Sequence, residues 1–277
     1  MSAAPGLAIL GAGGRVGSLL RGSGAMRGAS WFSRRGGGGA QAWDLLADTR
    51  PPQGLRGAGV MICLAGAAPE AELSEDCRLA LAAVRAAAAA GIGHVLIASS
   101  IAVYGARGAP WREDAALRPR NAYGRAKVHM EAALLDHAAR GGPQICLLRL
   151  GNVVGADAIS AAIAGGQTIT LDRCRDGGSP LRSVIGPVTL ARVLLALATR
   201  AGSGAGLPPV LNLAQPGPVE MAALCAAAGR DFVWRVGAPP PLPLAALDTG
   251  ALQMLVPVPA ADPAALMAEW RAAGGPV

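Results

Sequence analysis

Residues 7–17 read LAILGAGGRVG, and the rest of the fold can be worked out from them. Gly11, Gly14 and Gly17 lie where an apolar strand turns into a helix. There they allow a tight turn, close approach of the backbone to a pyrophosphate, and close packing of helix on strand. The start of the helix adds free N–H groups and a positive dipole end. A flexible turn is the alternative in a chain with 39 glycines. The position directly after an apolar strand favours dinucleotide binding, by Gly11, Gly14, Arg15, Val16 and Gly17.

About twenty residues further on, the second expected strand ends in Trp31-Phe32-Ser33-Arg34-Arg35. A site for NAD(H) usually has an acid here that binds the ribose hydroxyls. This chain has no Asp or Glu before Asp44. Ser33 and Arg34 can instead bind and neutralise a 2′-phosphate. The pattern predicts NADP(H) as the preferred cofactor and NAD(H) as the second choice. The alternative is that Arg34 and Arg35 are solvated loop residues.

Short apolar runs alternate with Ala-rich stretches of helical length through the first half of the chain. The expected strands are 7–10, 29–33, 40–45, 60–65, 94–99 and 145–150, and the expected helices are 16–25, 73–90 and 123–140. This alternation predicts an α/β fold, a Rossmann-type doubly wound parallel sheet.

The second half is less regular. Residues 156–181 predict an irregular insertion, followed by helices at 188–200, 220–228 and 263–273 and a strand at 210–213. We expect an NAD(P)-binding core over 1–155 plus 182–215. A small C-terminal α/β substrate lobe is expected over 156–181 plus 216–277.

The segment NAYGRAKVHME, residues 121–131, carries the strongest catalytic pattern. Tyr123 and Lys127 are four residues apart and share one face of a helix. A phenol is a poor base at neutral pH, and a nearby ammonium favours its ionised form. Such a Tyr can exchange a proton with an alcohol or a carbonyl oxygen while a nicotinamide exchanges hydride. Lys127 is the only lysine among the 25 basic residues, which argues against the alternative of an ordinary helix pair.

Two serines end the expected strand in HVLIASSIAVYG, residues 94–105. Ligands of open α/β sheets bind at this carboxyl edge. The Ser100 hydroxyl can therefore hold a reacting oxygen near Tyr123, which makes Ser100 a catalytic and substrate-binding candidate. Serines also end strands for purely structural reasons.

These motifs together resemble the extended short-chain dehydrogenase/reductase family, in its NAD(P)-dependent epimerase/dehydratase branch. The similar segments are the glycine turn with Leu10 in place of Thr, the strand 60–65, Ser99–Gly105 for SSxxVYG, Tyr123–Lys127 for YGxxK, Leu148–Gly155 for LRxxNVYG, Val210–Leu213 and Leu247–Thr249. The resemblance implies that Leu64 and Ala65 line the cofactor. It also implies that Lys127 bonds the nicotinamide ribose, and that substrate lies between the core and the lobe.

The chain departs from this family in two places. Arg182–Thr189 keeps only the Arg of an Arg-x-x-x-His-Val-x-Asp segment. The helix that usually begins with Asn and contains Gly-Thr has Asp76 and Leu79-Ala80. Together with a short lobe, these departures argue against a standard nucleotide-sugar substrate. Arg149, Asn152 and Arg182 are substrate candidates, and Arg149 and Arg182 are equally compatible with structural ion pairs.

The amino-acid composition argues against several other classes of function. The net charge is +7 but only 3% of residues are aromatic, so isolated arginines without stacking rings argue against nucleic-acid binding. The five cysteines and three histidines show no metal-ligand spacing. No apolar run is long enough for a bilayer, and no signal-peptide pattern opens the chain, so we expect a cytoplasmic protein with no membrane partner.

Three functions stay open. The first is an NAD(P)-dependent oxidoreductase that reduces a carbonyl or keto-sugar with NADPH, using Tyr123, Lys127 and Ser100. The second is a nucleotide-sugar epimerase or dehydratase with recycled cofactor. The third, a non-catalytic NADPH-binding sensor or assembly factor, is disfavoured because Tyr123 and Lys127 are both present. The resemblance also suggests a homodimer.

Overall fold

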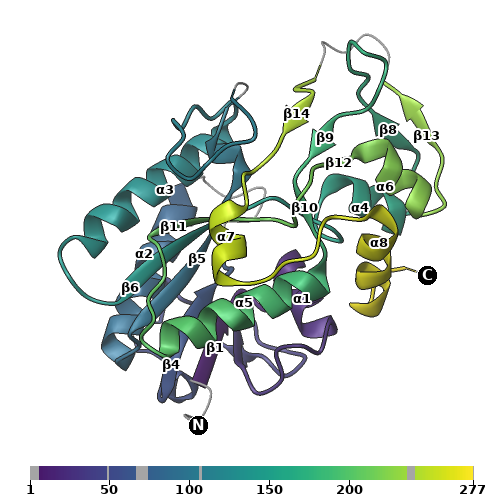
Figure 1. The fold of residues 1–277 in the computed structure, drawn as a ribbon. Coiled ribbons are helices and arrows are strands. Elements are labelled where there is room, and N and C mark those ends of the chain that lie inside the picture. The colour runs from purple at the N-terminus through teal and green to yellow at the C-terminus, as the bar shows by residue number, and fades with distance from the viewer. Residues whose placement is uncertain (1–5, 49, 67–73, 106–107, 236–240, 277) are drawn as a thin grey trace.

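A computed structural model describes residues 6–48, 50–66, 74–105, 108–235 and 241–276. Its centre is a seven-stranded sheet in the order β11-β6-β5-β4-β1-β2-β3, with every neighbouring pair parallel (Figure 1). The strands are β1 (Gly6–Leu10), β2 (Ser30–Ser33), β3 (Gln41–Ala42), β4 (Ala58–Cys63), β5 (His94–Ser100), β6 (Gln144–Leu150) and β11 (Val210–Leu213). The predicted Rossmann-type parallel sheet is confirmed, and each strand lies within a few residues of its expected range.

Helices cover both faces of this sheet, as the alternation of apolar runs predicts. They are α1 (Arg15–Gly22), α2 (Ser74–Ala90), α3 (Ala122–Ala138) and α5 (Pro187–Gly202), with short 3₁₀ turns η1 (Gln53–Leu55) and η2 (Ile101–Val103). The expected first residue of α2, Leu73, lies outside the described residues. No helix among the described residues is long and apolar enough to cross a membrane.

Successive strand residues supply the two faces, because side chains alternate along a strand. Ile9 and Ile62 belong to the core under α1 and α5. Their neighbours Leu10 and Met61 belong to the core under α2 and α3. Buried parallel strands of this kind read as continuous apolar runs, which is why the sequence marked them so clearly.

Local chemistry fixes where the helices begin. The Asn121 side chain accepts a hydrogen bond from the Gly124 N–H at 2.8 Å and so caps α3 directly before Tyr123. Pro187 opens α5 at a position where a missing N–H costs nothing. The Asp262 side chain caps α8 (Pro263–Ala272) by accepting from the Ala265 N–H at 2.8 Å.

Most of the remaining elements form a smaller region beyond the carboxyl edge of the sheet, at the upper right of Figure 1. They are β7 (Asn152–Val153), α4 (Ala158–Ala164), β8 (Ile169–Leu171), β9 (Leu181–Arg182), β10 (Val184–Ile185), β12 (Val219–Glu220), α6 (Met221–Ala227), β13 (Phe232–Trp234) and β14 (Leu244–Ala245). They build small sheets β10-β7, β12-β9-β14 and β13-β8. Helix α7 (Gly250–Leu255) instead contacts β11 of the central sheet. The exact boundaries of core and lobe stay a prediction.

The prediction of an irregular insertion over 156–181 is wrong, because this segment contains α4 and β8. The Asp157 side chain caps α4 by accepting from the Ser160 N–H at 2.7 Å. Strand β8 pairs in parallel with β13, Ile169 opposite Phe232. A three-residue strand whose partner lies so far along the chain leaves no local signal in the sequence.

Candidate active site

The glycine turn joins β1 to α1 and packs against the end of β4. Gly11 has a φ of +94°, and a Cβ there would lie 2.7 Å from the Ala65 N. A Cβ on Gly17 would lie 2.2 Å from the Gly11 carbonyl oxygen, so α1 could not approach the turn. Gly14 is the N-cap of α1 and has no side chain, so no side chain accepts a hydrogen bond from the first N–H groups of the helix. The structure thus gathers the predicted turn residues Gly11, Gly14, Arg15, Val16 and Gly17 beside Leu64 and Ala65.

The end of β2 lies against the same turn. A Cβ on Gly13 would stand 3.7 Å from the Cβ of Ser33, so Ser33 borders the turn as expected. The Ser33 hydroxyl donates to the Gly36 carbonyl oxygen at 3.3 Å. Arg34 is not a free loop residue, because its Nη2 lies 3.2 Å from Oε1 of Glu75 in the first turn of α2.

Tyr123 and Lys127 occupy the first turns of α3 and face each other. The Lys127 Nζ lies 5.7 Å from the centre of the Tyr123 ring. Tyr123 is 45% exposed, whereas Lys127 is buried. The ammonium has a buried partner, since Asp76 Oδ2 in the first turn of α2 is 3.2 Å away. The pair therefore combines an accessible phenol with a cation held in the interior.

A close contact between α3 and η2 brings Tyr123 to the segment that follows Ser100. A Cβ on Gly124 would lie 2.2 Å from the Ala102 carbonyl oxygen, so only glycine allows this approach. Ser100 ends β5, and its Oγ accepts from the Ala102 N–H at 3.2 Å. That bond uses an oxygen lone pair and leaves the hydroxyl hydrogen available for donation. The glycine after Tyr123 therefore has a packing role.

Cys63, the last residue of β4, is buried near the charges of Lys127 and Asp76. Burial raises the pKa of its thiol to about 11, and the neighbouring Asp76 carboxylate adds to the increase. A hydrogen bond with the Ala65 backbone and the Lys127 charge act in the opposite direction. Cys63 is thus a neutral thiol at physiological pH and carries no nucleophilic role here.

Arg149 lies in a buried network rather than at an open surface. Its Nη2 is 2.7 Å from Glu131 Oε2, its Nε is 3.1 Å from Glu131 Oε1, and the two side chains are 5% and 2% exposed. Its Nη1 donates to the Tyr104 hydroxyl at 2.8 Å and to the Glu113 carbonyl oxygen at 2.9 Å. Burial opposes its charge, but these partners outweigh burial and raise its pKa. Of the two roles left open by the sequence, the contacts are those of the structural ion pair.

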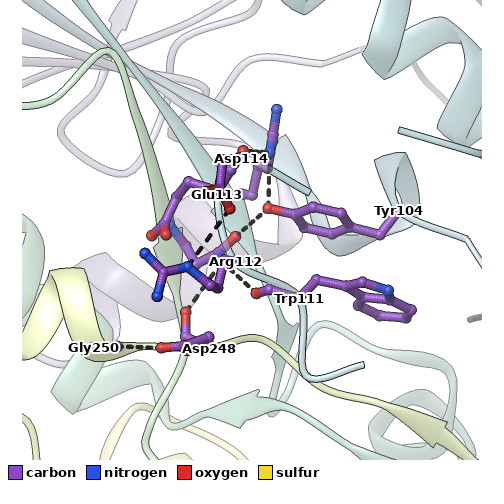
Figure 2. Close-up of polar contacts among 9 residues, drawn as sticks. Tyr104, Trp111, Arg112, Glu113, Asp114, Asp248 and Gly250 are labelled. Atoms are coloured by element: carbon purple, nitrogen blue, oxygen red, sulfur yellow. Dashed lines mark hydrogen bonds and ion pairs between the residues drawn. The ribbon is translucent and has the colours of Figure 1, made fainter. Parts of the chain in front are cut away.

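This network ties the core to the segment 111–114 (Figure 2). The Tyr104 hydroxyl donates to Asn212 Oδ1 at 2.8 Å, and Asn212 Nδ2 donates to the Trp111 carbonyl oxygen at 2.8 Å. The Tyr104 and Trp111 rings stack with centroids 5.3 Å apart. Burial raises the pKa of Tyr104, while Arg149 and Asn212 lower it. The second tyrosine of the chain therefore serves packing, in contrast to the exposed Tyr123.

The other substrate candidates lie nearer the lobe. Asn152 is a half-buried residue of β7, and its N–H donates to the Ser183 carbonyl oxygen at 2.8 Å. Arg182 lies on β9, and its Nη1 donates to the Leu181 and Leu242 carbonyl oxygens at 2.8 and 2.9 Å. Burial lowers the pKa of Arg182, and the charge of Arg120 acts in the same direction. Arg182 is thus a half-buried cation of the lobe whose side chain is held by backbone carbonyls.

Sequence reasoning missed the two acids of α2. Glu75 and Asp76 are neighbours, and each pairs with a cation that the sequence had singled out. Asp76 was visible only as a departure from a family pattern. Their place in the sequence could have marked them as site candidates, because a helix that follows β4 begins at the same sheet edge as the glycine turn.

Comparison with known proteins gives one family. Residues 62–198 match the family described as "NAD dependent epimerase/dehydratase family". A UDP-glucose 4-epimerase from Azospirillum brasilense is 46% identical over 69 residues, which is 24% of this chain and 20% of that protein. The match thus spans about a fifth of the length of this curated relative.

Solved structures extend the likeness in fold to almost the whole chain. A UDP-N-acetylglucosamine 4-epimerase from Bacillus cereus has a TM-score of 0.76 at 16% identity, covering 98% of this chain and 100% of that one. A UDP-glucose 4-epimerase from Thermus thermophilus in complex with NAD has a TM-score of 0.72 at 20% identity, covering 98% and 99%. At such identities these structures support the fold, while the matched segment supports the predicted family.

Proposed function

The chain belongs to the NAD dependent epimerase/dehydratase family through residues 62–198, and on this premise we propose that it is an epimerase or dehydratase of nucleotide sugars with a recycled dinucleotide. In this scheme hydride is taken from the carbon of one sugar hydroxyl and is later returned to the sugar within the same active site, with loss of water in the dehydratase case. This is the second of the three functions that the sequence left open, and it is favoured over net carbonyl reduction because the compared proteins are epimerases of UDP-sugars.

One observation carries the catalytic part of the proposal. Tyr123 is accessible and faces the buried Lys127 ammonium, whose Nζ is 5.7 Å from its ring centre. Asp76, 3.2 Å from that Nζ, fixes the ammonium in place. A held cation beside a phenol supports proton exchange at the phenol oxygen. Tyr123 would accept the proton of a sugar hydroxyl and return one to the carbonyl oxygen, and Ser100 would hold that oxygen by donation from its hydroxyl.

The residues at the glycine turn fit a dinucleotide. Gly11 and Gly17 let the end of β4 and α1 pack closely on the turn, because a Cβ on either residue would clash with backbone atoms, and the uncapped N–H groups of α1 suit a pyrophosphate. A bound nicotinamide would supply hydride acceptance and return at the sugar carbon. Leu64 and Ala65 would line it, and Lys127 would bond the nicotinamide ribose in addition to Asp76. A sensor without catalysis gives no reason for Tyr123 and Lys127 to stand together.

The substrate part of the proposal rests on the lobe. Arg182, a half-buried cation on β9, would attract the diphosphate of a nucleotide sugar. Asn152 offers an amide at the neighbouring β7. Arg149 is left out, because its guanidinium is occupied by Glu131, Tyr104 and Glu113.

A second candidate is reduction of a carbonyl or keto-sugar by NADPH, which Ser33 and Arg34 favour as contacts for a 2′-phosphate. The ion pair of Arg34 with Glu75 weakens this candidate, because the guanidinium already has an anionic partner. We therefore place NAD(H) before NADP(H), the reverse of the order that the sequence predicts. Location in the cytoplasm and assembly as a homodimer stay predictions.

Product analysis without external reductant tests this function. Protein loaded with NAD is incubated with UDP-glucose or UDP-N-acetylglucosamine, and the sugar ring is followed by NMR. We expect an epimerised or dehydrated product from the wild type and none from Tyr123→Phe. Unchanged nucleotide sugars, together with steady oxidation of NADPH by simple carbonyl compounds, would support the second candidate instead.

A further inference from the structure

The first turn of α2 sets two adjacent carboxylates against Arg34 and Lys127, two of the cations of the candidate site. Asp76 pairs with Lys127 in the interior, with side chains 4% and 7% exposed. Glu75 pairs with Arg34 nearer the surface, with side chains 21% and 58% exposed. One helical turn therefore touches both the catalytic end of the proposed dinucleotide site and the end where the adenosine ribose is read.

The Glu75 contact supplies what the second strand lacks. The stretch 31–35 holds no acid, and NADP(H) is predicted from this absence together with Ser33 and Arg34 as contacts for a 2′-phosphate. In the folded chain a carboxylate arrives at the same place from α2, 3.2 Å from the guanidinium expected to bind the 2′-phosphate. In NAD sites an acid near the end of the second strand accepts hydrogen bonds from the ribose hydroxyls, and Glu75 brings a carboxylate next to that strand end from another helix.

We propose that Glu75 is the cofactor-specificity residue of this chain and that it selects NAD(H) over NADP(H). The inference rests on the dinucleotide site of the proposed function. A 2′-phosphate bound by Arg34 would share its guanidinium with Glu75 and so lie roughly 6 Å from the carboxylate. At that separation the repulsion between a phosphate and a carboxylate weakens binding by about tenfold at moderate salt. NAD(H) carries no 2′-phosphate and escapes this penalty.

The exposure of this pair makes the inference testable without disturbing the fold. Ion pairs between solvent-exposed side chains contribute little to stability. Glu75→Gln keeps the shape of the side chain and removes only its charge. Asp136→Asn is the matched control, since Asp136 also pairs with an arginine, Arg140, on an exposed helix surface, that of α3.

The experiment is a titration of NADH and NADPH, followed by nicotinamide fluorescence, on five proteins: wild type, Glu75→Gln, Arg34→Ala, the double variant of these two, and the control Asp136→Asn. We expect the wild type to bind NADH more tightly. Glu75→Gln should bind NADPH about tenfold more tightly than the wild type does, with NADH changed by less than about threefold. The double variant should lose that gain, because the freed guanidinium is what binds the phosphate. Asp136→Asn should match the wild type with both dinucleotides.

Two results would overturn the inference. One is a wild type that prefers NADPH and loses this preference in Arg34→Ala, because Arg34 would then bind the phosphate despite Glu75. The other is binding of both dinucleotides that Glu75→Gln does not change. Failure of the proposed function looks different: nucleotide sugars would stay unconverted while the NADH preference and its response to Glu75→Gln persist. Binding of neither dinucleotide would contradict both.

Discussion

Removing one member of the Asp76–Lys127 pair should destabilise the whole fold. Both side chains are at most 7% exposed, and Nζ and Oδ2 are 3.2 Å apart. Asp76→Leu would leave the only lysine of the chain buried without its carboxylate. Breaking a buried pair in this way costs about 3–5 kcal/mol, and the loss of an acid from the first turn of α2 adds up to about 1 kcal/mol. For a chain of this size, a loss of that order lowers Tm by roughly 10 °C.

The assay is urea unfolding followed by the fluorescence of the five tryptophans, on a double-mutant cycle. Asp76→Leu and Lys127→Met should each be strongly destabilised. The double variant should lose much less than the sum, by at least about 2 kcal/mol, because two apolar side chains can replace a buried ion pair at little cost. Asp136→Asn, on the exposed surface of α3, controls for loss of a carboxylate.

Two results would refute this reasoning. If the free energy of unfolding of Asp76→Leu lies within about 1 kcal/mol of the wild-type value, the ion pair is not held away from water as its burial implies. If the two single changes add without coupling, Asp76 and Lys127 do not depend on each other. The second result would also remove the argument that Asp76 fixes the ammonium beside Tyr123.

Three further predictions follow from other parts of the structure. Glu131→Gln should lower the free energy of unfolding by about 3 kcal/mol in urea, since it leaves Arg149 charged and buried; a variant as stable as the wild type would contradict the structural role of that pair. Gly17→Ala should abolish NADH binding in a fluorescence titration, because its Cβ would lie 2.2 Å from a carbonyl oxygen, whereas Gly93→Ala, with nothing within 4 Å of its Cβ, should bind normally. Cys63 has a thiol pKa raised from 9.0 to about 11, so it stabilises the fold fully below pH 9 and this contribution is lost as pH rises towards 11. Between pH 9 and 11 this lowers the free energy of unfolding by about 1.4 kcal/mol per pH unit. The free energy of unfolding, measured in urea across this range, should therefore fall less steeply with pH for Cys63→Ala than for the wild type. Equal slopes for the two proteins would show that the thiol is not buried as described.

The sheet could be predicted from the sequence because its signals are local. Each buried strand is a continuous apolar run, and the glycine turn marks the first crossing from strand to helix. Strand β8 gave no such signal, because three residues acquire strand geometry only through pairing with β13. The Asp157 cap of α4 was readable in principle, but in an Ala- and Gly-rich segment it did not stand out.

The candidate site also contains residues that local sequence signals predict and residues that they do not. Tyr123 and Lys127 could be predicted because four-residue spacing on a helix fixes their common face. The partners of charged side chains could not, because Glu75 and Asp76 meet Arg34 and Lys127 only after α2 has packed on the sheet. Arg149 is an example, since the sequence around it is equally compatible with substrate binding and with a structural ion pair. Its burial beside Glu131 distinguishes the two.

We propose that the chain carries out a redox-neutral reaction on a nucleotide sugar, with Tyr123 exchanging the proton. This proposal is tested most directly by isotope retention. Protein loaded with NAD is given UDP-glucose or UDP-N-acetylglucosamine with deuterium on the sugar ring, without any external reductant, and the product is examined by mass spectrometry and NMR. We expect the wild type, and not Tyr123→Phe, to form a product that still carries the deuterium of the oxidised carbon. Product that appears only when NADPH is added, and that takes its new hydrogen from that NADPH, would contradict the proposal.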